Sequence, residues 1–175
     1  MREVYYDIET QKSAAEVGGW QNTHLMRVSV AVTWSEQDGF RRWQENEAGA
    51  LISYLCSHDR VISYNGDGFD SKVLSFYGDV SEIHRRSLDL ATALKRNLGH
   101  RIRLDSIAQP TLGTGKTADG LTALRWWKEG KLELIAEYCQ QDVQVLVDLL
   151  KFVRTNGYLR YLDLSGHERT VYLRL

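Results

Sequence analysis

The chain has 175 residues, of which 43% are hydrophobic and 26% charged, and its formal net charge is −1. This length fits one domain with a substantial core, and the composition excludes a disordered or collagen-like chain and argues against binding nucleic acid through overall basicity. No apolar run reaches the roughly 18 residues of a membrane span, and two cysteines are too few for a disulfide framework. We therefore expect one domain over residues 1–175, located in the reducing cytoplasm and without a membrane partner.

The first half of the chain predicts mainly strands. Residues 2–9 alternate between polar and apolar side chains, which is typical of a strand with one buried face. Two further segments, 26–34 and 39–43, extend this into an antiparallel meander. A helix is predicted at 46–57, followed by a short buried strand at 60–64 that ends at the Asn-Gly turn of residues 65–66.

The second half predicts mainly helices, and the tail predicts a hairpin. Helices are expected at 70–77, within 87–98 where Gly99 supplies the C-cap, as one turn at 104–108 before Pro110, and at 131–154, which carries an apolar stripe at helical spacing. Strands at 158–164 and 170–175 form a C-terminal β-hairpin. This order predicts an α/β fold with a mixed sheet flanked by helices, in which the core covers residues 1–155 and the hairpin covers 156–175.

Four acidic residues lie inside or beside apolar segments, where burial of a carboxylate costs free energy. Asp7 and Glu9 are two residues apart on the first strand, so their carboxylates project from one face. Asp70 opens a helix after a turn, and Asp142 lies within the apolar stripe of the longest helix, four residues after Tyr138. Buried carboxylates need partners, and hard divalent cations such as Mg²⁺ or Mn²⁺ prefer oxygen ligands, so these acids predict one metal centre built from distant segments.

Each motif also has a simpler explanation when it is taken alone. Asp7 and Glu9 fit solvated charge on a surface strand, and Asp70 fits a helix N-cap. Tyr138 fits a core tyrosine whose hydroxyl is satisfied by Asp142. In the metal-centre hypothesis, the same phenol orients or deprotonates an attacking water.

Taken together and in this order, the three motifs resemble those of the DEDD superfamily of 3′–5′ exonucleases. Asp7-x-Glu9 matches the first motif, Asn65 with Phe69-Asp70 the second, and Tyr138-x-x-x-Asp142 the third, in the form of the tyrosine (DEDDy) subgroup. The segment from Leu104 to Leu150 also resembles a little-characterised bacterial branch of ribonuclease H-like proteins. The resemblance implies a ribonuclease H-like fold with a five-stranded mixed sheet.

The resemblance also implies a role for each motif residue. Asp7 bridges two Mg²⁺ or Mn²⁺ ions, Glu9 and Asp142 complete the tighter site, and Asp70 holds the second ion. Tyr138 positions the attacking water, and the product is a 5′-mononucleotide released from a free single-stranded 3′ end of DNA or RNA. A helicase or a polymerase is a candidate partner.

Other residues are candidates for contact with the nucleic acid. The basic segment 84–103 contains Arg85, Arg86, Arg101 and Arg103, which we expect to contact backbone phosphates. Trp20, which follows the first motif, is expected to stack a terminal base or to pack in the core at the end of a loop. Lys116 is expected to reach a phosphate or to be a flexible exposed lysine.

Three functions compete at this stage. The intact acids and Tyr138 favour a metal-dependent 3′–5′ exonuclease with a two-metal mechanism. A non-catalytic nucleic-acid-binding module needs none of these acids for chemistry. A structure-selective endonuclease on the same fold is the third possibility, and it differs from the exonuclease in cutting a substrate whose 3′ end is blocked.

Overall fold

The computed structural model describes residues 1–114 and 119–175, and its centre is a mixed five-stranded sheet. The strands lie in the order β3 (Gly39–Gln44), β2 (Val28–Ser35), β1 (Glu3–Thr10), β4 (Arg60–Ser63) and β5 (Ser87–Asp89). The first three form the predicted antiparallel meander, whereas β4 runs parallel to both β1 and β5. The predicted α/β class with a mixed sheet flanked by helices is confirmed.

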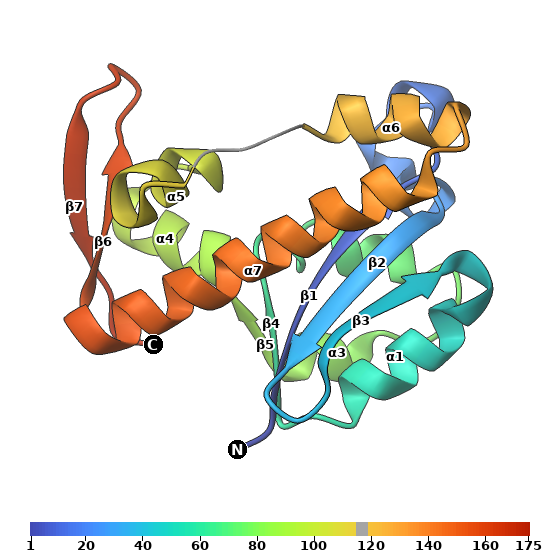
Figure 1. Ribbon diagram of the computed structural model, residues 1–175, viewed down its shortest axis with the longest axis horizontal. Coiled ribbons are helices and arrows are strands. Elements are labelled where there is room, and N and C mark those ends of the chain that lie inside the picture. The colour runs from blue at the N-terminus through green and yellow to red at the C-terminus, as the bar shows by residue number, and fades with distance from the viewer. Residues whose placement is uncertain (115–118) are drawn as a thin grey trace.

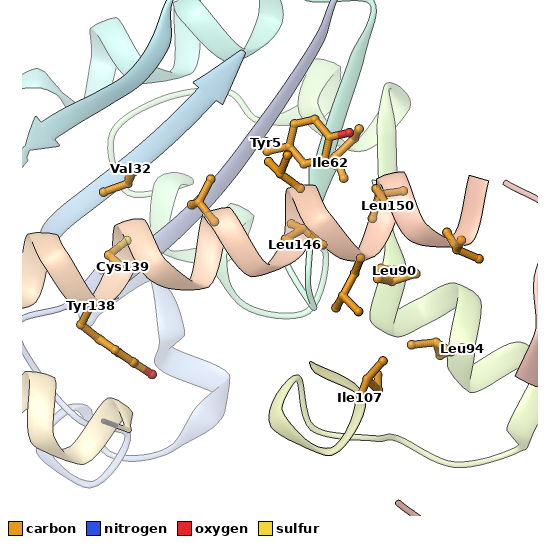
Figure 2. Close-up of a cluster of buried hydrophobic side chains, with 14 of the residues drawn as sticks. Tyr5, Val32, Ile62, Leu90, Leu94, Ile107, Tyr138, Cys139, Leu146 and Leu150 are labelled. Carbon is orange, nitrogen blue, oxygen red and sulfur yellow. The ribbon is translucent and has the colours of Figure 1, made fainter. Parts of the chain in front are cut away.

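Two hydrophobic clusters lie on opposite faces of this sheet, and the alternation along β1 supplies both of them. Tyr5 belongs to the cluster under α7 (Leu132–Asn156), which crosses one face of the sheet (Figures 1 and 2). Val4, Tyr6 and Ile8 belong to the second cluster, which α1 (Ala48–Cys56) and α3 (Ser81–Arg85) cover from the other side. Because a strand alternates its side chains between two faces, the polar–apolar pattern of β1 fixes which residues lie under α7.

The long helix α7 forms where its apolar stripe was predicted. Ile135, Leu146 and Leu149 are 2% exposed or less, and Gly157 ends the helix with a left-handed φ of 77°. Burial of each such side chain contributes about 1.5–3 kcal/mol, so packing against the sheet holds this helix more than its intrinsic propensity does.

Several elements between β3 and α7 differ from the prediction. The helix α5 (Asp105–Leu112) continues through Pro110 to a C-cap at Gly113, so the prediction that it ends before the proline is wrong. Pro110 removes one N–H donor, but Ile107 and Ala108 are buried and anchor the helix. The remaining elements are α2 (Asp70–Leu74), α4 (Leu90–Leu98) with Gly99 as its C-cap, α6 (Gly120–Lys128), and the 3₁₀ turns η1 (Ala15–Val17), η2 (Trp20–Leu25) and η3 (Glu45–Glu47).

The tail forms an antiparallel strand pair, β6 (Tyr158–Leu162) with β7 (Glu168–Tyr172). Its buried residues Leu159, Val171 and Leu173 join the cluster under α7, and the pair lies beside α5 and α4 at one end of the molecule (Figure 1). No helix within residues 1–114 and 119–175 combines the length and the apolar character needed to cross a bilayer.

Candidate metal centre

The first strand carries two carboxylates on the face that α7 covers. Asp7 and Glu9 lie opposite Val32 and Val30 of β2, and both valines belong to the cluster under α7. The two-residue spacing predicts this shared face, because alternate residues of a strand project on the same side.

The third carboxylate comes from α7. Asp142 is 9% exposed, and one oxygen from each of Asp7, Glu9 and Asp142 lies within 4.8 Å of the other two. Three carboxylates in this arrangement create a strongly negative electrostatic potential between them, which favours binding of a cation there.

The phenol of Tyr138 lies next to these acids. Its hydroxyl forms a hydrogen bond with Asp142, and its pKa is raised, first by burial and then by the charges of Asp142, Glu9 and Asp7. The phenol is therefore neutral near pH 7 in this environment. The bond to Asp142 is the one that a core tyrosine would make, but Tyr138 also lines the cavity described below.

The thiol of Cys139 supports the first carboxylate, a role that the sequence did not predict. Cys139 is fully buried. Its Sγ lies 3.3 Å from both the carbonyl oxygen and Oδ2 of Asp7 and donates a hydrogen bond there. Figure 2 shows that its side chain leaves α7 in a different direction from the phenol of Tyr138.

The fourth acid reaches the same strand from α2. Asp70 is 3% exposed and is the first residue of that helix, whereas the N-cap position is Phe69 and has no side-chain capping bond. The N-cap interpretation is therefore wrong: Oδ1 of Asp70 accepts a hydrogen bond of 2.9 Å from the backbone N–H of Ile8, between Asp7 and Glu9. The pKa of Asp70 is raised, first by burial and second by the charge of Asp7.

A buried aspartate that the sequence analysis missed holds the loop leading to Asp70. Asp89 is 6% exposed, and its carboxylate accepts hydrogen bonds from the backbone N–H groups of Asn65 at 2.8 Å and Asp67 at 3.2 Å. It also caps α4 through Thr92 at 3.2 Å. Asn65 has a left-handed φ of 67°, so this carboxylate stabilises a turn that a residue other than glycine adopts at a cost.

A cavity of about 1030 Å³ joins these residues. It is lined by all five predicted catalytic residues, by Trp20, Asn65 and Phe69, and by Arg101 and Arg103. Trp20 is 69% exposed and meets Phe69 edge-on, with 6.3 Å between the ring centroids. The core-packing alternative for Trp20 is therefore wrong, because most of its indole faces solvent.

The structure does not bring every basic candidate to this cavity. Arg85 pairs with Glu82, and the guanidinium of Arg86 donates to the backbone carbonyls of Cys56 and His58 at 2.6 and 2.7 Å. Neither arginine lines the cavity. The expectation of one basic track over residues 84–103 is corrected accordingly, because the donors of Arg86 are directed to the backbone at the end of α1. Lys116 lies outside the described residues.

The donor set fits a hard divalent cation. Carboxylate oxygens are the ligands that Mg²⁺ and Mn²⁺ prefer, and Asp7, Glu9 and Asp142 supply them from two elements that are fixed by the core. Asp70 extends the acidic centre by one further buried carboxylate, whose pKa is raised by burial and by the charge of Asp7.

A solved structure shares this fold. The family B DNA polymerase of the hyperthermophilic archaeon Pyrobaculum calidifontis superposes with a TM-score of 0.66 at 14% identity, over 87% of this chain and 24% of the polymerase. An exonuclease I structure superposes with a TM-score of 0.49 at 14% identity, over 88% of this chain and 41% of that one. At this identity the likeness to the polymerase concerns the fold alone.

A curated relative is similar in sequence. "Putative DNA polymerase 060R" of Frog virus 3 (isolate Goorha) is 30% identical over 97 residues, which are 53% of this chain and 9% of that protein. The chain thus spans about a tenth of that relative and about a quarter of the archaeal polymerase. The family model of the RNase_H superfamily matches residues 4–154, which include all four acids and Tyr138. The chain therefore belongs to the RNase H superfamily.

Proposed function

We propose that this protein is a metal-dependent nuclease that acts as a 3′–5′ exonuclease on single-stranded ends of nucleic acid. The observation that carries the proposal is the convergence of Asp7, Glu9 and Asp142 within 4.8 Å in a cavity that also contains Asp70 and Tyr138. A domain that only binds nucleic acid does not need this cluster of four acids and a tyrosine, because carboxylates repel the phosphates of the ligand.

The four acids hold two Mg²⁺ or Mn²⁺ ions in this proposal. Asp7, Glu9 and Asp142 would hold one ion, and Asp70 together with Asp7 would hold the other. When bound, two such cations neutralise the charge that develops on the attacking and leaving oxygens of an in-line phosphoryl displacement. Cys139 holds the Asp7 carboxylate in place through its thiol hydrogen bond.

Tyr138 orients the water that attacks phosphorus. Its neutral phenol is hydrogen-bonded to Asp142 and does not remove the proton of that water. The bond from the water oxygen to phosphorus forms as the bond from phosphorus to the 3′ oxygen of the preceding nucleotide breaks. The attacking water loses one proton to the surrounding solvent, and the departing 3′ oxygen takes one from solvent, so the net reaction consumes one water and yields a 5′-mononucleotide and a strand shorter by one nucleotide.

The exposed indole of Trp20 fits the terminal base. Trp20 and Phe69 form an aromatic corner at the wall of the cavity, and stacking on an aromatic side chain stabilises a base by about 1–3 kcal/mol whatever its identity. Asn65, at the turn before Phe69, supplies an amide within the same lining. The two polymerase names among the similar proteins favour a nucleic-acid substrate, and a polymerase or a helicase is the partner class that we propose.

The experiment that tests this function is a cleavage assay on 5′-labelled single-stranded DNA and RNA oligomers, with and without Mg²⁺ or Mn²⁺. The proposal predicts metal-dependent shortening from the 3′ end and release of 5′-mononucleotides, both stopped by a 3′-phosphate. Internal cuts in the blocked oligomer would establish an endonuclease instead. Salt-sensitive binding without hydrolysis under either metal would establish a binding module.

A further inference from the structure

One part of the cavity wall lies beside the acidic centre rather than on it. This part is formed by the connection from α4 to α5, which has neither helix nor strand over residues 101–103, together with the end of β4 and the start of α4. We call it the 101–104 wall, and its members are Tyr64, Ala91, Arg101, Ile102, Arg103 and Leu104.

The 101–104 wall is fixed to the sheet one strand away from the acids. The hydroxyl of Tyr64, directly after β4, donates a 2.7 Å hydrogen bond to the carbonyl oxygen of Ile102. Ile102 and Leu104 pack against the core under α7. Since β4 is the neighbour of β1 in the sheet, the backbone of Tyr64 lies about one strand spacing, about 4.8 Å, from β1. The segment 101–104 lies farther out, at the end of the Tyr64 side chain.

Two arginines in this wall are available to a ligand. Arg101 is exposed, and among residues 1–114 and 119–175 no carboxylate lies within salt-bridge distance of it. The side chain of Arg103 is 77% exposed, and its nearest ion-pair partner, Asp105, is 3.9 Å away, which is beyond hydrogen-bond distance. Arg86 of the same basic segment differs, because backbone carbonyls occupy its guanidinium.

The pattern of the wall matches a nucleotide rather than an isolated anion. The guanidiniums of Arg101 and Arg103 alternate along the chain with the apolar side chains of Ile102 and Leu104. A guanidinium binds a phosphate, and an apolar surface beside it accommodates a base. The cavity volume of about 1030 Å³ lies just above the roughly 300–1,000 Å³ range of small-molecule pockets, so it has room for more than one nucleotide.

We infer that the 101–104 wall is a second nucleotide subsite, which binds the single strand on the 5′ side of the scissile bond through the phosphate next to that bond. This inference rests on the proposed function. Arg101 and Arg103 contact that neighbouring phosphate, while Trp20 and Phe69 receive the terminal nucleotide. The protein therefore acts on a strand of at least three nucleotides more efficiently than on a single nucleotide ester.

The test compares two substrates of the same chemistry. The p-nitrophenyl ester of thymidine 5′-monophosphate has a scissile phosphodiester but no upstream phosphate, whereas a tetrathymidylate has both. For the double variant Arg101→Gln/Arg103→Gln we expect kcat/KM on the tetranucleotide to fall about tenfold more than on the ester, mainly through KM, since removal of a charge-assisted hydrogen bond costs about that factor. Arg96→Gln is the matched control, because it removes one exposed charge on α4 outside the cavity.

A second arm measures binding without hydrolysis. With Ca²⁺ in place of Mg²⁺, the slope of log K against log salt for a labelled oligothymidylate should become shallower by about 0.7 in the double variant, because one phosphate is no longer neutralised. The slope should not change in Arg96→Gln. Circular dichroism checks that both variants are folded.

The outcomes separate the subsite from the proposed function. Wild-type protein that hydrolyses neither substrate overturns the proposed function, and the salt slope then still tests the subsite. Equal losses on the ester and the tetranucleotide, or a salt slope equal to that of wild type, overturn the subsite while leaving the nuclease intact. The same loss in Arg96→Gln assigns the effect to general surface charge and also overturns the subsite.

Discussion

Replacement of Asp70 by asparagine should stabilise the metal-free protein and do so increasingly as the pH rises. The side chain is 3% exposed, and burial followed by the charge of Asp7 raises its pKa in the folded state above the unfolded value of about 3.9. A group with a raised pKa contributes stability at low pH that is lost as the pH rises through the folded pKa. Asparagine has the same shape, and its Oδ1 can still accept the N–H of Ile8.

The size of this effect follows from proton linkage. From about pH 4 up to the folded pKa of Asp70, the wild-type protein loses up to about 1.4 kcal/mol per pH unit through this group, and the variant does not. For a chain of this length, each kcal/mol shifts Tm by about 2–4 °C, so the Tm difference should grow by up to about 3–6 °C per pH unit.

Thermal unfolding in EDTA between pH 4 and 8 measures this difference. Asp79→Asn is the control, because Asp79 is fully exposed and the N–H of Ser81 lowers its pKa, so its contribution is constant above about pH 5. Addition of Mn²⁺ should raise the Tm of wild type more than that of Asp70→Asn. A pH-independent Tm difference, or a variant less stable than wild type at every pH, would refute the reasoning.

Three further variants probe the support of the site. Cys139→Ala removes the thiol donor to Asp7 and should weaken Mn²⁺ binding, measured by calorimetry, whereas Cys139→Ser should restore part of it; equal affinities of all three proteins would contradict the positioning role. Gly66→Ala places a Cβ 2.3 Å from Oγ of Ser63 and should lower the free energy of unfolding by about 1–3 kcal/mol in urea titration; a neutral effect would show that the loop adapts. Tyr138→Phe should lower kcat about 10²-fold and keep the Mn²⁺-induced rise in Tm, and loss of both would make the phenol a structural group.

The sequence predicts those parts of the site that depend on local periodicity. Alternation on the first strand places Asp7 and Glu9 on one face, and helical spacing places Tyr138 beside Asp142. Both arguments need only the geometry of a single element.

Long-range contacts account for the features that the sequence did not predict. The hydrogen bond that Asp70 accepts from the N–H of Ile8 joins residues 62 positions apart, and the thiol contact of Cys139 with Asp7 joins residues 132 positions apart. The short strand β5 is set by pairing with β4 rather than by its own pattern. The arginines of the segment 84–103 separate for the same reason, because Arg86 folds back to the end of α1 and Arg101 follows α4 towards the cavity.

The measurement that tests the central claim most directly is metal-dependent release of mononucleotides by wild type and by Asp7→Asn. The carboxylate of Asp7 lies within 4.8 Å of both other acids and is the group that we assign to both cations, so the substitution should lower the rate by at least about 10²-fold at saturating Mg²⁺. Near-UV circular dichroism establishes that the variant is folded. Wild-type release that requires Mg²⁺ or Mn²⁺, together with this loss, is the predicted result, and undiminished release by folded Asp7→Asn would contradict the assignment of the metal centre.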